Sequence, residues 1–343
     1  MSPEPVPNEQ LARANELAES LGRELLQAVH RRVLAVDVVA DGGGRHRLAH
    51  GRRGAGHRVA AQVDHVHGSE CTSRAEADPA CAESAPSDSL GPVLQDVATL
   101  AECWRGAERV AVLTGAGLST ASGIPDFRSP GGRWERYQPV LIQDFLAHGS
   151  AREEYWRYKG ETWQVIRAAE PNPAHTALAA LTRADRIDLL VTQNVDGLHE
   201  RSGIDSDRLV NIHGTDSEAT CMACGKRAAR DEVQRLWEAG AAVPLCDCGG
   251  PWKPSTISFG QNLVPEDLER AMTEASRCTL FVAAGTSLVV GPINEMFDVA
   301  QRAGATTAIL AASATPYDGA CDLKLTDPVE QTLPATQRLV LAD

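Results

Sequence analysis

Residues 115–129 combine a phosphate-binding turn with side chains that could do chemistry. The run begins Gly-x-Gly, which lets the backbone approach a pyrophosphate, and the helix expected next would direct its N-terminal N–H groups at the anion. Asp126, Phe127 and Arg128 then place an acid, an aromatic ring and a base beside that ligand. Thr120 stands where the third glycine of Gly-x-Gly-x-x-Gly is expected, so the run predicts a phosphate site with unusual neighbours.

Two more polar clusters stand at the ends of apolar, strand-like runs. Gln193, Asn194 and Asp196 follow one such run, and a single histidine, His213, follows another. Ligands bind at the carboxyl ends of the strands in an open α/β sheet, so we expect these side chains to meet at one site. An imidazole with an ordinary pKa of about 6.5 can accept a proton near neutral pH, which makes His213 a candidate general base.

The alternation of apolar runs with helical segments predicts the elements that position these residues. Strands are expected at 109–114, 188–193, 209–213, 279–284, 306–311 and 323–326. Helices are expected near 265–277 and 292–303, after an amphipathic helix that carries Val93, Val97, Leu100, Ala101 and Trp104 on one face. This order predicts an α/β fold with a Rossmann-like, doubly wound parallel sheet.

Three segments do not fit the alternation. Residues 130–175 are rich in Trp and Tyr and too long for an ordinary loop, so we expect a helical lobe there. Residues 216–258 carry paired cysteines and are expected to form a small inserted module. Residues 1–90 are expected to be a low-complexity, disordered extension, or the product of a start codon placed too far upstream, which leaves 91–343 as the catalytic domain.

The cysteine spacing predicts a structural zinc site. Cys221-x-x-Cys224 and Cys246-x-Cys248 offer four thiolates, which would close a tetrahedral coordination sphere and hold together a module with little core of its own. The C-x-C pair is one residue shorter than C-x-x-C and requires a tighter turn. The remaining cysteines have no ligand spacing and are not expected to bind metal or act as nucleophiles: Cys71, Cys81, Cys103, Cys278 and Cys321.

Composition narrows the classes of partner. The 343 residues carry a formal net charge of −13, which argues against non-specific binding to nucleic acid. No apolar run reaches the roughly 20 residues of a membrane span, and the polar start has no secretory signal pattern. Reduced cysteines in metal-type pairs fit a reducing compartment. We therefore expect a cytoplasmic protein without membrane or direct nucleic-acid partners.

Several motifs together resemble the sirtuin (Sir2-like) family of NAD-dependent protein deacylases, over residues 91–343. The resemblance is carried by GAGLSTASGIPDFRS, TQNVDGLHERSG, NIHGT, the two cysteine pairs and the turn Gly285-Thr-Ser-Leu288. It implies a transferase that consumes NAD as a cosubstrate and needs one structural Zn²⁺. In that chemistry the amide oxygen of an acylated lysine attacks C1′ of the nicotinamide ribose and nicotinamide leaves. The products are free lysine and 2′-O-acyl-ADP-ribose.

The resemblance also implies the roles of individual residues. His213 would be the general base on the ribose hydroxyls, and Asn194 and Asp196 would complete the catalytic set by binding those hydroxyls and the carboxamide. Phe127 would cover the ribose and exclude water. The residues expected to bind NAD are Gly115, Ala116, Gly117, Ser119, Thr120, Ile124, Asp126, Phe127, Arg128, Gln193, Asn194, Asp196, Gly285, Thr286, Ser287, Ala311 and Cys321.

Two departures from the family pattern affect the ligands. Ala311-Ala-Ser313 stands where relatives usually have Asn-x-Glu, and the lost side-chain hydrogen bond predicts weaker NAD binding by about 1 kcal/mol. Tyr158 stands where relatives that prefer acidic acyl groups have the arginine of Tyr-x-x-Arg, which favours acetyl. The acylated protein is expected to bind as an added β-strand against residues 258–261 and 288–291. We expect this protein to act as a monomer.

Three alternatives remain open from the sequence. A protein mono-ADP-ribosyltransferase would use the same NAD site. A dehydrogenase would need an acid about 20 residues after the glycines, where Glu135 stands, but Glu135 follows no predicted strand. A zinc-ribbon or NAD-binding module without catalysis is disfavoured by the presence of His213, Asn194 and Asp196 together.

Overall fold

The computed structural model describes residues 92–128 and 131–342, and every structural statement below concerns these residues. They belong to the larger of the two compact units into which the chain divides. The predicted extension, residues 1–90, lies outside the described residues.

A six-stranded sheet with strand order β3-β2-β1-β7-β8-β9 forms the centre of this unit, and all its neighbouring strands are parallel. The order reverses beside β1, which pairs with β2 on one side and with β7 on the other. This reversal is the topological switch point at which doubly wound sheets bind ligands. The strands are β1 (Val110–Thr114), β2 (Leu189–Thr192), β3 (Leu209–Asn211), β7 (Leu280–Ala284), β8 (Thr306–Leu310) and β9 (Leu323–Leu325).

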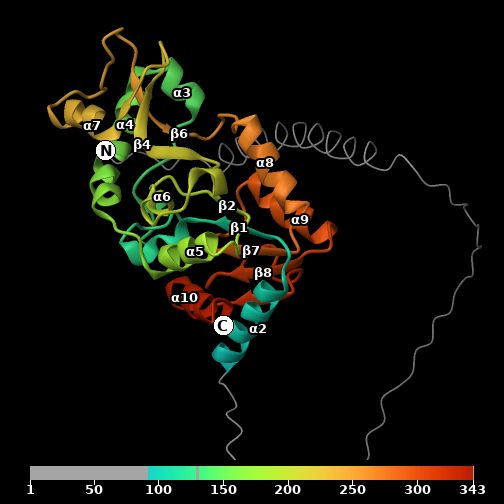
Figure 1. Cartoon of the computed structure of the whole chain (residues 1–343). Helices are drawn as coiled ribbons and strands as arrows, with labels where there is room; N and C mark the ends of the chain where they lie inside the picture. Colours follow the sequence, from blue (N-terminus) through green and yellow to red (C-terminus); the bar gives the residue numbers. More distant parts are fainter. Residues whose placement is uncertain (1–91, 129–130, 343) are drawn as a thin grey trace, which may run out of the picture. The chain divides into compact units, whose positions relative to one another are not determined.

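Helices cover both faces of this sheet, as Figure 1 shows. On one face α2 (Pro92–Gly106), α5 (Pro173–Arg183) and α10 (Val329–Val340) pack Trp104, Leu178 and Leu333 against alternate strand residues such as Val112. On the other face α8 (Pro265–Ala275) and α9 (Met296–Arg302) contact the intervening residues, Phe281 among them. Because both faces are covered, β1 and β7 are buried along their whole length, which explains their continuous apolar sequence.

The predicted strands are all present within two residues of their expected ends, and the predicted doubly wound fold is confirmed. One local expectation is wrong. The glycine turn after β1 continues not into an α-helix but into two single-turn 3-10 helices, Ala116–Leu118 and Thr120–Ser122. The second turn ends at Gly123, whose φ of 82° allows the left-handed conformation that reverses the chain.

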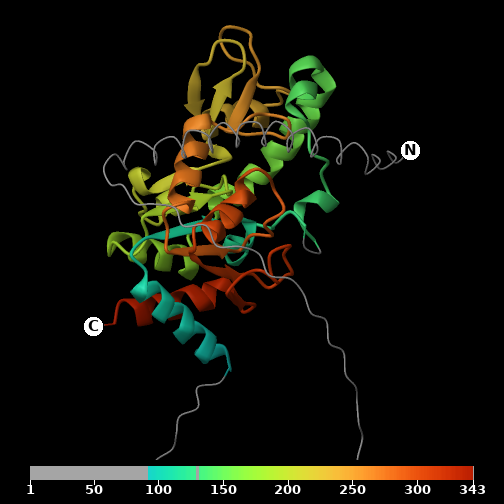
Figure 2. The same cartoon turned by 90° about the vertical axis from the view of Figure 1, so that its right-hand side faces the viewer.

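A second layer forms at the end of the unit opposite to α2 and α10, as Figures 1 and 2 show. The Trp- and Tyr-rich segment contains α3 and α4, and the cysteine-bearing segment contains α7 and an antiparallel sheet of order β5-β4-β6. Phe145, Trp156 and Trp252 share one buried cluster, so the helical lobe and the inserted module pack on each other. The elements are α3 (Ile142–Ala147), α4 (Gly149–Ala168), β4 (Gly214–Cys221), β5 (Arg227–Ala229), α7 (Arg230–Glu238) and β6 (Trp252–Thr256).

A buried ion-pair network joins this layer to the loop that follows β2. Asp216 of β4 accepts from Lys159 Nζ of α4 at 2.8 Å and from Arg230 Nε of α7 at 3.2 Å. Burial alone would raise the pKa of Asp216, yet Lys159 and Arg230 lower it below its usual value. The Asp216 N–H donates to Val195 O at 2.8 Å, so the network holds the loop between Asn194 and Asp196.

The remaining elements are short connections. They contain α6 (Leu198–Arg201) and the 3-10 helices η3 (Arg133–Glu135), η4 (Ser206–Arg208) and η5 (Ile293–Glu295). Asn172 caps α5, whose first residue is Pro173. Among the described residues, no helix combines the length and the apolar character that crossing a bilayer requires.

Candidate active site

A cavity of about 1270 Å³ lies along the carboxyl ends of the central strands. Pockets for one small ligand usually measure about 300–1,000 Å³, so this cavity can hold more than one molecule. Cys321 does not line it and instead packs against the core beside α9, whereas the other predicted residues do line it. These are Gly115, Ala116, Gly117, Ser119, Thr120, Ile124, Asp126, Phe127, Arg128, Gln193, Asn194, Asp196, His213, Gly285, Thr286, Ser287 and Ala311.

The glycine turns after β1 and β7 touch, which requires that they have no side chains. Gly117 N donates to Gly285 O at 2.8 Å. A Cβ on Gly115 would lie 2.8 Å from Thr286 Cβ, and one on Gly285 would lie 2.3 Å from Leu118 N. The φ of Gly285 is +62°, a left-handed value that also favours glycine. The two turns therefore form one smooth backbone floor suited to a phosphate.

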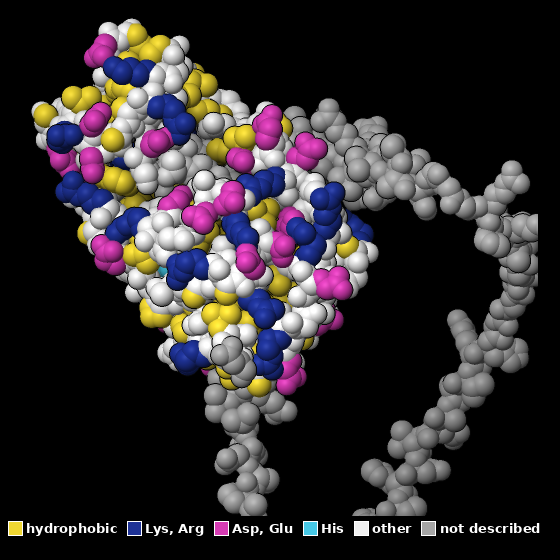
Figure 3. Space-filling view, viewed as in Figure 1, with side chains coloured by type: hydrophobic (Ala, Val, Ile, Leu, Met, Phe, Trp, Pro, Cys, Tyr) yellow, Lys and Arg dark blue, Asp and Glu magenta, His cyan; other side chains and the backbone are white. Residues whose placement is uncertain are grey.

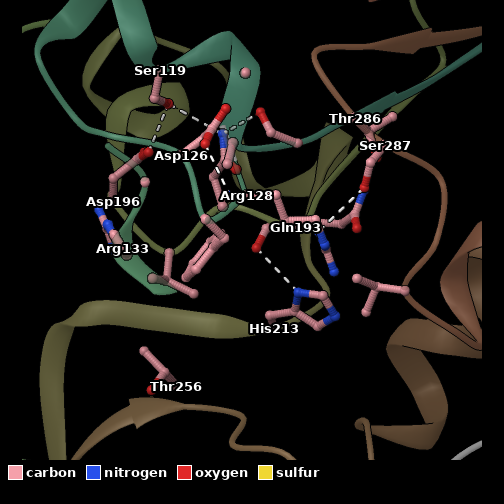
Figure 4. A pocket seen from close by; sticks show the side chains of 18 of the residues that line it. Ser119, Asp126, Arg128, Arg133, Gln193, Asp196, His213, Thr256, Thr286 and Ser287 are labelled. Atoms are coloured by element: carbon pink, nitrogen blue, oxygen red, sulfur yellow. Dashed lines mark hydrogen bonds between the residues drawn. The ribbon is translucent and has the colours of Figure 1, made fainter. Parts of the chain in front are cut away.

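Polar side chains brace this floor from both sides. Gln193 Nε2 donates to Thr286 Oγ1 at 2.8 Å, and Arg128 Nη1 donates to Ser287 Oγ at 3.3 Å. Figure 4 shows Thr286 and Ser287 on one side of the cavity and Ser119 and Asp196 on the other, with Gln193 between them. Burial lowers the pKa of Arg128, and nearby Asp126 partly offsets that effect.

Asn194 and Asp196 are held by the Gly115 turn and by Ser119. Asn194 Nδ2 donates to Gly115 O at 3.0 Å and to Ser119 Oγ at 3.1 Å. Ser119 Oγ donates to Asp196 Oδ2 at 2.8 Å, and Leu198 N donates to Asp196 Oδ1 at 3.0 Å. Burial raises the pKa of Asp196, while these hydrogen bonds act in the opposite direction. The arrangement presents a fixed carboxylate to a hydrogen-bond donor such as a carboxamide.

His213 follows β3 and reaches the same cavity. Its Nδ1 lies 3.1 Å from Gln193 O. Because a carbonyl can only accept, Nδ1 carries the proton in the neutral ring and Nε2 keeps its lone pair. Burial lowers the pKa of His213, with a smaller opposite effect from the bond to Gln193. The imidazole is therefore neutral near pH 7 and can accept a proton through Nε2.

Several residues that line the cavity are not predicted from the sequence. Arg133 lies with its guanidinium carbon 5.2 Å from the centre of the Phe127 ring, and its Nε donates to Pro125 O at 3.1 Å. Arg133 lies in the Trp- and Tyr-rich segment, where no motif of the sequence indicates a residue of the cavity. At the far end, Asp327 and Glu330 follow β9, where the strand-end rule that located Asn194 would have found them. On the lobe side Lys159 and Thr256 also line the cavity, beside Tyr155 and Tyr158 of the segment that the sequence relates to the acyl group.

Two other histidines near the site, His175 and His199, have structural partners. His175 occupies the third position of α5, and its Nδ1 accepts from Asn172 N at 3.4 Å. His199 of α6 is buried against Thr114. Glu135, the residue with dehydrogenase spacing, lies exposed in η3 and accepts from Gly131 N, far in sequence from any strand end.

The four paired cysteines form a metal-type cluster. Their Sγ atoms all lie within 4.8 Å of one another. Cys221 and Cys248 are 3.5 Å apart, and Cys224 and Cys246 are 3.9 Å apart. Zn–S bonds of about 2.3 Å place tetrahedral sulfurs about 3.8 Å apart, so the set fits zinc and the C-x-C turn does not prevent it. Four protein ligands leave no open position, which fits a structural metal.

Comparison with known proteins identifies the family. The model of the Sir2 family matches residues 115–292. The "NAD-dependent protein deacetylase 1" of Bradyrhizobium diazoefficiens is 39% identical over 227 residues, which cover 66% of this chain and 89% of the relative. "NAD-dependent protein deacetylase 2" of Streptomyces coelicolor is 38% identical over 68% of this chain and 98% of its own.

Solved structures show the same likeness. The structure called "Sir2-p53 peptide-NAD+" matches with a TM-score of 0.62 and 34% identity, over 68% of this chain and 93% of that one. "Sir2 bound to acetylated peptide" matches with a TM-score of 0.62 and 33% identity, over the same shares. The motifs, the fold, the cysteine cluster and these relatives agree, and the chain belongs to the Sir2 family, the sirtuins.

Proposed function

We propose that this protein removes acyl groups, above all acetyl, from lysine side chains of proteins while consuming NAD. The observation that carries the proposal is that His213, Asn194 and Asp196 line one cavity together with the glycine floor. Relatives at 38% and 39% identity bear the name NAD-dependent protein deacetylase, which supports the same activity here.

The residues present fit NAD. Gly115, Gly117 and Gly285 line the cavity without side chains, and a Cβ at any of them would clash with the neighbouring turn, so the floor can bring a pyrophosphate close to the backbone. Arg128 supplies a cation beside that floor, and Asp196 supplies an acceptor for the nicotinamide carboxamide. When bound, NAD supplies an activated ribose carbon that can be transferred to an acyl oxygen.

The protein's own part in the reaction is to orient, to exclude water and to move one proton. Phe127, with the Arg133 guanidinium over its ring, lines the cavity and would shield the ribose from water. His213 takes a proton from a ribose hydroxyl at Nε2, while Gln193 O holds the resulting imidazolium through Nδ1–H. Asn194 stays fixed by Gly115 and Ser119 and offers its amide oxygen to the ribose.

The substrate side of the cavity suits an extended peptide with a small neutral acyl group. Segments 256–261 and 289–292 both line the cavity, so an acyl-lysine peptide can add as a strand between them. Tyr155, Tyr158 and Thr256 form the wall on the lobe side, which favours acetyl. On the face that Figure 3 shows, acidic and basic side chains are interspersed, which suits a protein partner better than nucleic acid. We expect a monomer to be sufficient for this activity. We expect the protein to act in the reducing environment of the cytoplasm.

The test uses the full-length protein, radiolabelled NAD and an acetyl-lysine peptide. We expect free lysine, nicotinamide and label on a small acyl-ADP-ribose, all detected by mass spectrometry and counting. Label transferred to protein with the acetyl group intact would instead support a mono-ADP-ribosyltransferase. If the protein binds NAD but forms neither product, both the deacylase and the mono-ADP-ribosyltransferase are contradicted.

A further inference from the structure

Two buried histidines behind the cavity wall take no part in the proposed reaction. His175 is fully buried and His199 is 1% exposed, and their ring centres lie 5.0 Å apart with planes inclined by 55°. His175 Nε2 and His199 Nδ1 have no hydrogen-bond partner among the residues that the structure describes. Unsatisfied buried polar atoms are rare in folded proteins, and two on neighbouring rings point to a shared purpose.

The hydrogen bonds around His175 fix the position of its proton. The Asn172 N–H donates to His175 Nδ1 at 3.4 Å, so Nδ1 is an acceptor. In a neutral ring the proton then lies on Nε2. Burial supports the neutral form, since it lowers the pKa of His175 to about 4. The atom of His175 that lacks a partner is therefore a donor.

The same reasoning places the proton of His199. Thr114 has one hydroxyl hydrogen and donates it to Thr192 Oγ1 at 2.9 Å. Its 3.0 Å contact with His199 Nε2 must then be one in which the nitrogen donates. His199 Nδ1 is left as a bare acceptor beside the Nε2–H of His175. The two atoms without partners are thus a donor on His175 and an acceptor on His199, on rings whose centres lie 5.0 Å apart.

We propose that His199, Thr114 and Thr192 form a directional hydrogen-bond relay that positions the loop carrying Asn194, with the His175 ring packed against His199 at its start. The relay reaches that loop because Thr192 Oγ1 accepts from Asn194 N at 3.1 Å. It reaches the phosphate floor as well, since Thr114 directly precedes the glycine turn. His199 is thus a positioning residue for NAD, although it does not line the cavity.

The first experiment observes the proton order in the unmodified protein. Full-length protein labelled with ¹⁵N in its histidine rings is examined by long-range ¹H–¹⁵N spectroscopy, and His175→Asn and His199→Gln variants assign the signals. We expect both rings to be neutral near pH 7 and protonated on Nε2. A His199 signal from the Nδ1–H form, or from imidazolium, would overturn the proposal.

The second experiment separates positioning from packing. His199→Gln places an amide N–H where Nε2–H stood, whereas His199→Phe keeps a ring and removes the donor. We expect the Kd for NAD, measured by calorimetry, to rise about tenfold in His199→Phe and to stay within about threefold in His199→Gln. Thr182→Val is the control, because it removes a buried hydroxyl that bonds only within α5. Its Kd should not change.

If His199→Phe and His199→Gln have equal Kd values for NAD, whatever their melting temperatures, the side chain at position 199 serves packing alone. This result would overturn the relay. The role of Asn194 assumed here rests on the proposed function. Calorimetry and spectroscopy do not require catalytic turnover. If the protein shows the expected proton order but has no deacylase activity, only the proposed function is contradicted.

Discussion

At the scale of single residues, the site depends on how His213 is held. One ring nitrogen is used by Gln193 O, so the other is oriented and free to accept a proton. Burial lowers the pKa of the ring, which keeps it neutral under conditions where an exposed histidine would begin to protonate. The residue can act as a base because of its surroundings, which only the folded chain provides.

Replacing His213 with alanine should lower kcat by about 10²- to 10⁴-fold, because a positioned general base contributes about that much. NAD binding, measured by calorimetry, should remain. In the unmodified enzyme the acid limb of kcat/KM should have its midpoint below about pH 6.5, since a base with a lowered pKa stays active to lower pH. A midpoint above about pH 6.5 would show that the acid limb of kcat/KM reports another group, or a His213 that is charged near neutral pH.

Gly115→Ala tests the close approach of the two glycine turns. The added Cβ would lie 2.8 Å from Thr286 Cβ and 2.9 Å from Gly285 O, so one turn has to move. We expect the KM for NAD to rise about tenfold or more, with about 1–3 kcal/mol lost from the free energy of unfolding. Gly106→Ala is the matched control, because nothing lies within 4 Å of a Cβ at that position. Similar kinetics in both variants would contradict the account.

At the scale of elements, the reversal of strand order beside β1 brings together turns that are far apart in sequence. The turns after β1, β2 and β7 then open on the same edge of the sheet. The second layer closes that edge from above, and Asp216 connects the layer to the loop after β2. Catalytic geometry therefore depends on contacts between elements as well as on the motifs themselves.

Asp216→Asn should destabilise the protein strongly. The change would leave Lys159 and Arg230 buried without their carboxylate, and breaking a buried pair costs about 3–5 kcal/mol. Urea unfolding measures the loss. Asp247→Asn removes the partner of Lys226 at the exposed surface and should leave the midpoint unchanged. If the two variants were equally stable, the network would have no role in holding the second layer.

Removing zinc should unfold the inserted module first. Treatment with a chelator should release one metal per chain, raise amide hydrogen exchange across β4 and β6, and abolish deacylation, because β4 carries Asp216. Cys248→Ser should reproduce these effects. Cys321→Ser, which changes a cysteine outside the cluster, should not. Full activity in metal-free protein would contradict the proposed structural role.

At the scale of the whole molecule, buried neutral histidines make stability depend on pH. The pKa of His175 is about 4 in the folded chain and about 6.5 when unfolded. Between these values only the unfolded chain binds the proton, so stability rises with pH across this window and is lost as pH falls through it. The full effect is about 3 kcal/mol. The pKa of His199 is lowered by burial in the same direction.

Urea unfolding at about pH 4.5 and about pH 7 measures this effect. In His175→Asn the amide oxygen can replace Nδ1 as the acceptor for the Asn172 N–H, but the titrating ring is gone. The loss of stability on acidification should therefore be smaller in the variant than in the parent protein. An identical loss in both would show that other groups determine the acid response.

Much of this molecule could be predicted from its sequence because strands and turns are local. The six strands follow from apolar runs, and the cysteine cluster follows from spacing. Contacts between distant elements could not be predicted. Arg133 on Phe127 and Asp216 between Lys159 and Arg230 depend on tertiary packing, which no local pattern encodes. Cys321, which the resemblance places among the NAD-binding residues, does not line the cavity, whereas Asp327 and Glu330 after β9 do.

The central claim is that the loop tips at Asp126, Asn194 and His213 surround one nicotinamide riboside. A crystal structure with NAD and an acetyl-lysine peptide tests it most directly. We predict nicotinamide against Asp196, the ribose within hydrogen-bonding reach of His213, and the pyrophosphate on the glycine floor. A nicotinamide ring bound outside this cavity, or a ribose beyond the reach of His213, would contradict the account.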